Sequence, residues 1–179
     1  SAEKREKRDR LRDLLETVAN IYHDQLVRHP AGKTAREFLI KRGVTDATRD
    51  DWKLGYALDG WDSMTQHLLS SGYSREELIE AGVVSEQRDT NGDPIPNGRI
   101  YDRFRNRLMI PIRETNGFMS GFGARILNPN DVPKFLNSPQ TILFDKGKTL
   151  FGYDRAKTAI RERDQAVIVE GYFDVIILH

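Results

Sequence analysis

The residue whose type and position most clearly suggest chemistry is Glu170, which lies near the end of the 179-residue sequence. An apolar run rich in β-branched residues, 166–169, precedes it, and Gly171 follows before the apolar spacing becomes helical. This pattern predicts a buried strand that delivers a catalytic carboxylate to the edge of an α/β sheet, where such sheets bind ligands. The alternative is a structural carboxylate that is favoured by the positive end of a helix dipole.

A second set of candidate residues is basic. The segment 99–125 holds six arginines and only two acids, Asp102 and Glu114, although the net charge of the chain is only +1. Three lysines, Lys134, Lys146 and Lys148, extend the basic segment. Such a local surface indicates a polyanionic partner, and the alternative is an ordinary solvated face.

Arg103 and Arg105 are the most specific pair in this set. They are two residues apart in a segment that we expect to be extended, so both side chains should share one face, with Phe104 on the other. Arginine binds phosphate oxygens in a bidentate manner, which suits a nucleic-acid backbone or a triphosphate. The alternative is that both arginines form surface ion pairs with Asp102 or Glu114.

Helices and then β structure must position these residues. Apolar spacing and capping signals predict helices at about 11–28, 33–42, 46–52, 61–71, 74–82 and 156–163. Strands are expected at 54–58, from residue 83, at 107–113 and at 118–126, with a hairpin turn at 116–117. A polar loop is expected at 128–133, with 134–139 in a loop between β elements.

This order predicts an α+β fold: a helical N-terminal part, then a small and mostly antiparallel sheet, then the first strand and helix of an α/β unit. We expect a charged linker or helix start at 1–12, a basic subdomain at 13–164, and the truncated beginning of a second subdomain at 165–179. Trp52 and Trp61 are interpreted as core anchors, and the four histidines show no metal-ligand spacing.

Composition narrows the class of protein. Hydrophobic residues make up 38% and charged residues 31%, which is typical of a soluble globular protein. No apolar run approaches the roughly 20 residues of a membrane span, and no signal peptide is visible. The absence of cysteine excludes disulfides and a thiolate zinc site within the sequence. We therefore expect a cytoplasmic protein with no membrane partner.

Five blocks, in order, resemble the DnaG-type bacterial DNA primases. They are 101–113, 121–125, 133–139, 144–148 and 169–174, and shorter matches lie at 38–43 and 60–62. The resemblance covers the chain from about Leu11, and several blocks in the family's order are far more specific than any one alone. The sequence departs from the family at Ala124, usually glycine, at Phe135, usually tyrosine, and at Asp145, usually histidine. The acid at 145 is expected to weaken phosphate binding by its neighbour, Lys146.

The resemblance implies a set of residues that contact template or nucleotide: Arg42, Arg103, Arg105, Arg125, Lys134, Asn137 and Lys146. Considered alone, Lys146 is more typical of plain surface. Arg42 alone would be a helix C-terminal charge that the dipole favours. The paired glycines Gly121 and Gly123 alone indicate a strand with a bulge.

The block at Glu170 resembles the first motif of the Toprim fold, which these primases share with topoisomerases. The resemblance implies that Glu170 is catalytic, as a metal ligand or acid/base, and that Asp174 is a second metal ligand. The resemblance implies Mg²⁺ or Mn²⁺ as the cofactor. Phosphodiester synthesis uses two divalent ions about 4 Å apart, which hold the attacking hydroxyl and the leaving pyrophosphate. The remaining carboxylates would lie beyond His179, so we expect the isolated chain to bind nucleic acid weakly and to be catalytically incomplete.

The implied parent enzyme is a DNA-directed RNA polymerase that makes short RNA primers for replication. Its partners would be a single-stranded DNA template, ribonucleoside triphosphates, the RNA primer and, through a C-terminal domain absent here, the replicative helicase. Zinc would belong to a separate N-terminal domain. Two alternatives stay open: a non-catalytic Toprim-related DNA-binding module, or a piece of a Toprim nuclease or topoisomerase. A downstream Asp-x-Asp motif would favour a catalyst, and an upstream Cys/His cluster would favour a primase.

Overall fold

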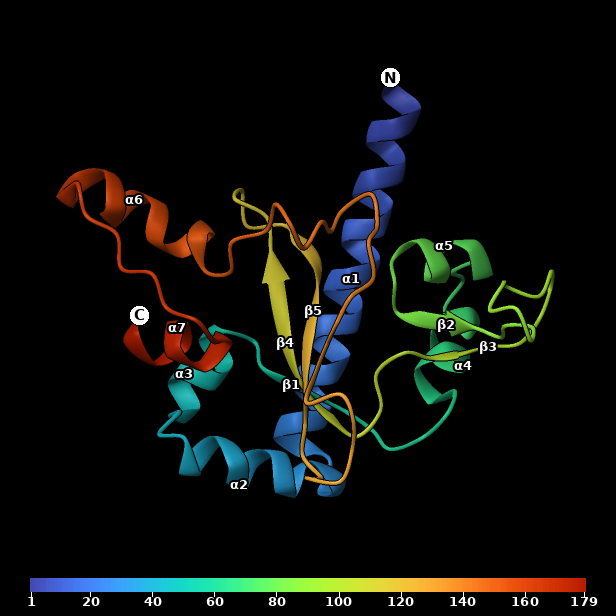
Figure 1. The fold of residues 1–179 in the computed structure, drawn as a ribbon, viewed down its shortest axis with the longest axis horizontal. Coiled ribbons are helices and arrows are strands. Elements are labelled where there is room, and N and C mark those ends of the chain that lie inside the picture. The colour runs from blue at the N-terminus through green and yellow to red at the C-terminus, as the bar shows by residue number, and fades with distance from the viewer.

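The computed structural model describes residues 1–179 and has the α+β architecture expected from the sequence (Figure 1). The helices are α1 (Ala2–Arg28), α2 (Lys33–Lys41), α3 (Asp46–Asp51), α4 (Ser63–Ser70), α5 (Arg75–Glu80), α6 (Tyr153–Arg163) and α7 (Tyr172–Leu178). The strands are β1 (Gly55–Ala57), β2 (Val84–Glu86), β3 (Ile100–Asp102), β4 (Arg107–Arg113), β5 (Met119–Ile126) and β6 (Phe135–Asn137). None of the helices combines the length and apolar character that crossing a membrane requires.

The main sheet is antiparallel throughout, with the strand order β1-β4-β5-β6. Alternation divides its side chains between two faces. On one face, Met109, Phe122 and Ala124 pack against the apolar stripe of α1. On the other, Leu108 and Ile110 pack with residues of α2, Trp52 and α7. The sheet therefore has a hydrophobic core on each side, and α7 is held by the second core.

Helix α1 also joins the sheet to a small lobe. Figure 1 shows this helix between the sheet and the lobe formed by α4, α5 and the β2–β3 pair. Leu68, Leu78 and Val83 of the lobe share one core cluster with Leu14 and Val18 of α1. The predicted capping box of α5 is present: Glu77 N–H donates to Ser74 Oγ, and Ser74 N–H donates to Glu77 Oε2. The local signal and the tertiary packing thus agree in this lobe.

The strand predicted at 166–169 is not formed, although the helix expected after it is present as α7. Val167 and Ile168 have exposed fractions of 78% and 88%, so this segment is not buried. An isolated strand cannot satisfy its backbone hydrogen bonds, and no strand of this chain lies beside these residues to pair with them. Apolar, β-branched composition alone was therefore insufficient to predict a strand here.

Two smaller expectations were also wrong. Residues 135–137 form the edge strand β6 rather than a loop, because Ala124 pairs with Leu136 across the ladder. The helix expected from Trp61 begins at Ser63, and Trp61 is an exposed residue rather than a core anchor. Residues 1–12, which were expected to be a charged linker or a helix start, form the start of α1, which begins at Ala2. Trp52 is buried as predicted.

Candidate nucleic-acid interface and carboxylate pocket

A pocket of about 540 Å³ lies where α7 meets β6 and the 144–151 segment. Four residues predicted to belong to the site line it: Glu170, Asp174, Asn137 and Lys146. They come from three separate parts of the sequence, and the fold brings them together around one space. The Glu170 side chain is exposed and has no hydrogen-bond or ion-pair partner within the chain. Its carboxylate is therefore free to meet a ligand.

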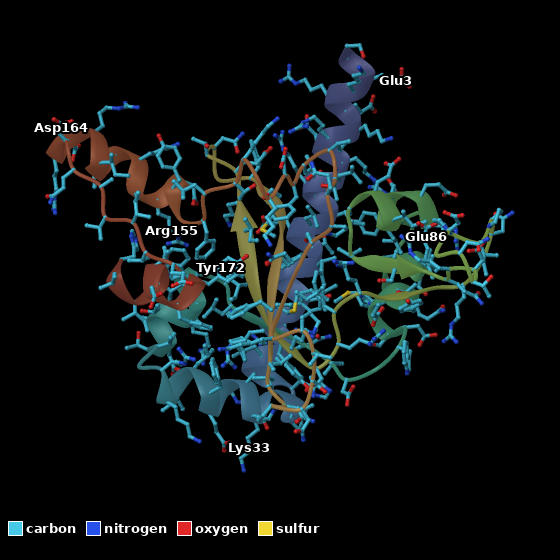
Figure 2. The ribbon with its side chains drawn as sticks, in the orientation of Figure 1. Glu3, Lys33, Glu86, Arg155, Asp164 and Tyr172 are labelled. Carbon is cyan, nitrogen blue, oxygen red and sulfur yellow. The ribbon has the colours of Figure 1, made fainter.

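Tyr172 connects this pocket to the basic segment. Its hydroxyl donates to Asn137 Oδ1 at 2.7 Å, and the Asn137 carbonyl accepts from Arg103 Nε and Nη2, at 3.3 and 2.8 Å. Figure 2 labels Tyr172 between α7 and the strands. Burial raises the pKa of Tyr172 to about 12, so the hydroxyl stays protonated and keeps donating at neutral pH. Nothing in the sequence analysis singled out Tyr172, although it directly follows the Glu170-Gly171 pair.

The glycines of β5 make the approach of Tyr172 possible. Gly121 and Gly123 lie on the face of the sheet that α7 covers, and a Cβ on Gly123 would be 2.8 Å from the Tyr172 ring. A Cβ on Gly121 would be 2.8 Å from Ser138 Oγ, which accepts a hydrogen bond from Phe122 N–H. These glycines therefore serve close approach. The hairpin also contains the expected bulge: Ile112 pairs with Gly121 and Arg113 with Met119, so Ser120, next to Gly121, is the extra residue of β5.

Arg42 and Arg125 form a second basic group beside α7. The Arg125 guanidinium carbon lies 4.3 Å from the centroid of the Phe38 ring, and that of Arg42 lies 5.2 Å from the same ring. Arg42 also lies 5.5 Å from the ring of Phe173 on α7. Burial lowers the pKa of Arg125, and the positive charge of Arg42 lowers it further. Arg125 Nε is buried without a hydrogen-bond partner.

Arg103 and Arg105 lie on the connection between β3 and β4. Phe104 is buried between them in sequence, which agrees with the predicted alternation of side chains. Arg105 lies over the ring of Trp61, at 3.9 Å from its centroid, and donates through Nη1 to the Asp102 carbonyl. Burial lowers the pKa of Arg103. Both arginines are thus fixed by neutral groups.

The predicted alternative, ion pairing with Asp102 or Glu114, does not occur. The Asp102 carboxylate accepts from Met64 N–H and Thr65 N–H at the start of α4, and Glu114 pairs with Arg8 and Arg12. Other basic residues of this region also lack a carboxylate partner. No carboxylate oxygen lies within 4.0 Å of the charged nitrogens of Arg42, Arg103, Arg105, Arg107, Arg125, Lys134 and Lys146. Cations without internal counter-ions create a positive potential that attracts an anionic ligand.

Three basic residues need separate comment. Arg107 is buried and donates to the Ala124 and Pro133 carbonyls, so its role is structural. Lys134 is exposed on the segment before β6 and does not line the carboxylate pocket. Asp145 pairs with Lys148 at 3.7 Å and not with its direct neighbour, Lys146. The acid at position 145 therefore leaves the Lys146 ammonium unpaired.

The pocket offers only part of a metal site. Glu170 and Asp174 supply hard oxygen donors of the kind that Mg²⁺ and Mn²⁺ prefer. Asp174 Oδ2 accepts from Gly171 N–H at 3.0 Å, which caps α7 and leaves Oδ1 for a further contact. No group of three or more histidine, cysteine, aspartate or glutamate side chains is arranged to hold a metal ion. The two carboxylates fit a divalent cation in chemistry but not in number.

Comparison with known sequences gives consistent matches. The family model described as the N-terminal domain of the DNA primase catalytic core matches residues 21–157. The DNA primase of Synechococcus elongatus is 45% identical over 175 residues, which are 97% of this chain and 24% of that protein. The chain thus spans about a quarter of the length of this curated relative. Neither alternative from the sequence, the binding module nor the nuclease or topoisomerase piece, is favoured by these matches.

Solved structures give the same answer for the fold. The RNA polymerase domain of Mycobacterium tuberculosis primase DnaG is similar with a TM-score of 0.84 and 37% identity, over 96% of this chain and 53% of that one. A DnaG primase catalytic domain bound to single-stranded DNA is similar with a TM-score of 0.82 and 36% identity, over 99% of this chain and 53% of that one. At these identities the likeness covers both fold and sequence.

Proposed function

The chain belongs to the family of the N-terminal domain of the DNA primase catalytic core, and we propose that it forms the nucleic-acid-binding side of a primer-synthesising site. The observation that carries the proposal is the set of cations without acidic partners beside a pocket that holds Glu170. Desolvated arginines without counter-ions favour a polyanion. A free carboxylate at the same place suits metal-dependent transfer of a phosphoryl group.

Each basic residue has a role in this proposal. Arg103 and Arg105 contact the phosphates of a single-stranded template, and Arg42 and Arg125 contact phosphates beside α7. Lys134 extends this track from the segment before β6. A bidentate guanidinium fixes the position of a phosphate, whereas a lysine acts as a mobile point charge. We call these five residues the basic face. They position the strand through its phosphates and do not recognise its base sequence.

The pocket residues have a different role. Asn137 and Lys146 orient a nucleotide phosphate, and Glu170 with Asp174 contributes to a divalent metal site for Mg²⁺ or Mn²⁺. When bound, such an ion would stabilise the charge that develops on the reacting phosphate. Within the chain, Asn137 is bonded to both Tyr172 and Arg103, which fixes the position of the carboxylate pocket relative to Arg103.

The proposal extends to the whole protein. It is a DNA-directed RNA polymerase that uses ribonucleoside triphosphates to make RNA primers on single-stranded DNA, in the cytoplasm. Residues 13–164 belong to its N-terminal core subdomain, and residues 165–179 begin its Toprim subdomain. Further domains supply a zinc site and the contact with the replicative helicase. By itself, the 179-residue chain binds nucleic acid weakly and does not synthesise primers.

Salt dependence of oligonucleotide binding tests the basic face. Replacing both Arg103 and Arg105 by alanine should make the slope of log K against log[salt] shallower by about 1.4, because each phosphate contact with a single strand contributes about 0.7. Fluorescence anisotropy with a labelled oligothymidylate measures this slope. The matched control replaces Arg8 and Arg12, which are paired with Glu114, and should leave the slope nearly unchanged. An unchanged slope in the Arg103/Arg105 variant would remove these residues from the interface.

A further inference from the structure

Trp61 is one of several large apolar residues that are exposed in this structure. Its exposed fraction is 60%, although the other tryptophan, Trp52, is buried. It lies in the irregular segment between β1 and α4. An exposed aromatic ring beside unpaired arginines is the composition that single-stranded nucleic acids use for base stacking.

The backbone on both sides of Trp61 is held in place. The Trp61 carbonyl accepts from Asp102 N–H at 2.7 Å, and the buried Asp102 carboxylate accepts from Met64 N–H and Thr65 N–H at 3.0 and 2.8 Å. Thr65 Oγ1 adds a third donor at 2.7 Å. The indole is therefore presented from a rigid support, which lowers the entropy that a ligand must remove on binding.

Two further side chains complete a platform, which we call the Trp61 platform: Trp61, Tyr101 and Arg105. The Tyr101 ring meets Trp61 edge-on at 5.6 Å between centroids, and its centroid lies 5.6 Å from the Arg105 guanidinium carbon. Arg105 covers one part of the indole at 3.9 Å and has no carboxylate partner. The platform thus offers aromatic surface and an unneutralised cation together.

We propose that the Trp61 platform binds an unpaired base of single-stranded nucleic acid by stacking, while Arg105 meets the adjoining phosphate. This inference rests on the proposed function, because it requires a single strand along the basic face. It adds Trp61 to the basic face. Arg103 contacts the Asn137 carbonyl at the edge of the carboxylate pocket, and Arg105 contacts Trp61. Every base has a π-face, so the site is tolerant of sequence.

Fluorescence tests the contact directly. In a Trp52→Phe variant Trp61 is the only tryptophan, and a stacked base should quench its emission as oligothymidylate is added. In the reciprocal Trp61→Phe variant, the buried Trp52 should report no change. Emission from Trp61 that stays constant while anisotropy shows saturating binding would overturn the proposal and leave the proposed function intact.

Affinity gives the second readout. Trp61→Ala should weaken binding by about 5- to 150-fold, which corresponds to roughly 1–3 kcal/mol per stacked base, and Trp61→Phe should recover most of the loss. The slope against salt should not change, unlike the slope for the Arg103/Arg105 variant. Phe118→Ala is the control, because Phe118 is 54% exposed under Arg12, an arginine neutralised by Glu114, and it should bind as the parent does.

An abasic oligonucleotide separates base contacts from phosphate contacts. It should bind the parent chain and the Trp61→Ala variant equally, because stacking is absent in both cases. Parent binding that is weakened by Trp61→Ala even with abasic DNA would overturn stacking as the cause. If the parent chain failed to bind any oligonucleotide, the proposed function and this inference would fall together.

Discussion

Arg12 and Arg105 each lie over an exposed aromatic ring, but only Arg12 has a carboxylate partner. The guanidinium carbon of Arg12 is 4.8 Å from the Phe118 centroid, and its nitrogens reach Glu114 at 2.6 Å. The guanidinium carbon of Arg105 is 3.9 Å from the Trp61 centroid, and no carboxylate neutralises it. An arginine over an aromatic ring therefore forms a neutralised internal contact in one region and an unneutralised cationic surface in the other.

The contrast extends to the two faces as wholes. Along α1, the cations of Arg8, Arg10 and Arg12 pair with Glu114 or Glu77, which ties the helix to the hairpin and to the lobe. On the basic face, Arg103 and Arg125 bond only to carbonyl oxygens. A net charge of +1 conceals this separation. Partner assignment, rather than the number of arginines, distinguishes structural cations from those available to a ligand.

The largest expected effect comes from Gly123→Ala, which disturbs the basic face and leaves the ion pairs of α1 intact. The new Cβ would be 2.8 Å from the Tyr172 ring, so overpacking should lower the free energy of unfolding by about 1–3 kcal/mol. Displacement of Tyr172 should also loosen the Asn137–Arg103 contact and weaken oligonucleotide binding. Urea denaturation and anisotropy measure the two effects.

The Tyr172→Ala background is the control for this clash. There Gly123→Ala should cost much less than it does in the parent, because the ring that it meets has been removed. Equal costs in both backgrounds would show that backbone effects, and not the Tyr172 contact, explain why position 123 is a glycine.

An intermediate effect is expected from Glu114→Gln, which releases Arg8 and Arg12 together. Loss of both ion pairs should lower the free energy of unfolding by about 1 kcal/mol, because the pairs lie at the surface but share one carboxylate. The α1 face would then carry unpaired arginines as well. If the contrast between the faces depends on pairing, oligonucleotide binding should strengthen slightly and become more dependent on salt. A decrease in binding would argue against that explanation.

The smallest effect concerns Glu16, which joins α1 to β4. Burial raises its pKa, but hydrogen bonds from Arg113 and Lys53 lower it by more, so the pKa lies below the ordinary value. A lowered carboxylate pKa contributes stability above the unfolded value of about 4.3, and this is lost as pH falls through the folded pKa. Glu16→Gln should therefore destabilise by under about 1 kcal/mol at pH 7. Denaturation at pH 7 and pH 3 should show the difference disappearing in acid.

Local signals in the sequence predicted much of the fold. The apolar spacing of α1, the Ser74–Glu77 capping box and the Asn116-Gly117 turn depend on neighbouring residues, and the corresponding elements are present. The 166–169 segment was wrongly predicted as a strand, because strand formation depends on a neighbour that composition does not reveal. β6 was missed because three residues carry too weak a periodicity.

The sequence by itself determined which residue types are available: the arginines, the acidic residue at 170 and the glycines of β5. Tertiary structure decided what each one faces. It assigned Asp102 to the start of α4 and Glu114 to α1, which leaves Arg103 and Arg105 without counter-ions. It also placed Tyr172 against Gly123, and Trp61 in solvent under Arg105. Ion pairs and close contacts join residues that are distant along the chain, so only the folded arrangement reveals which charges remain free.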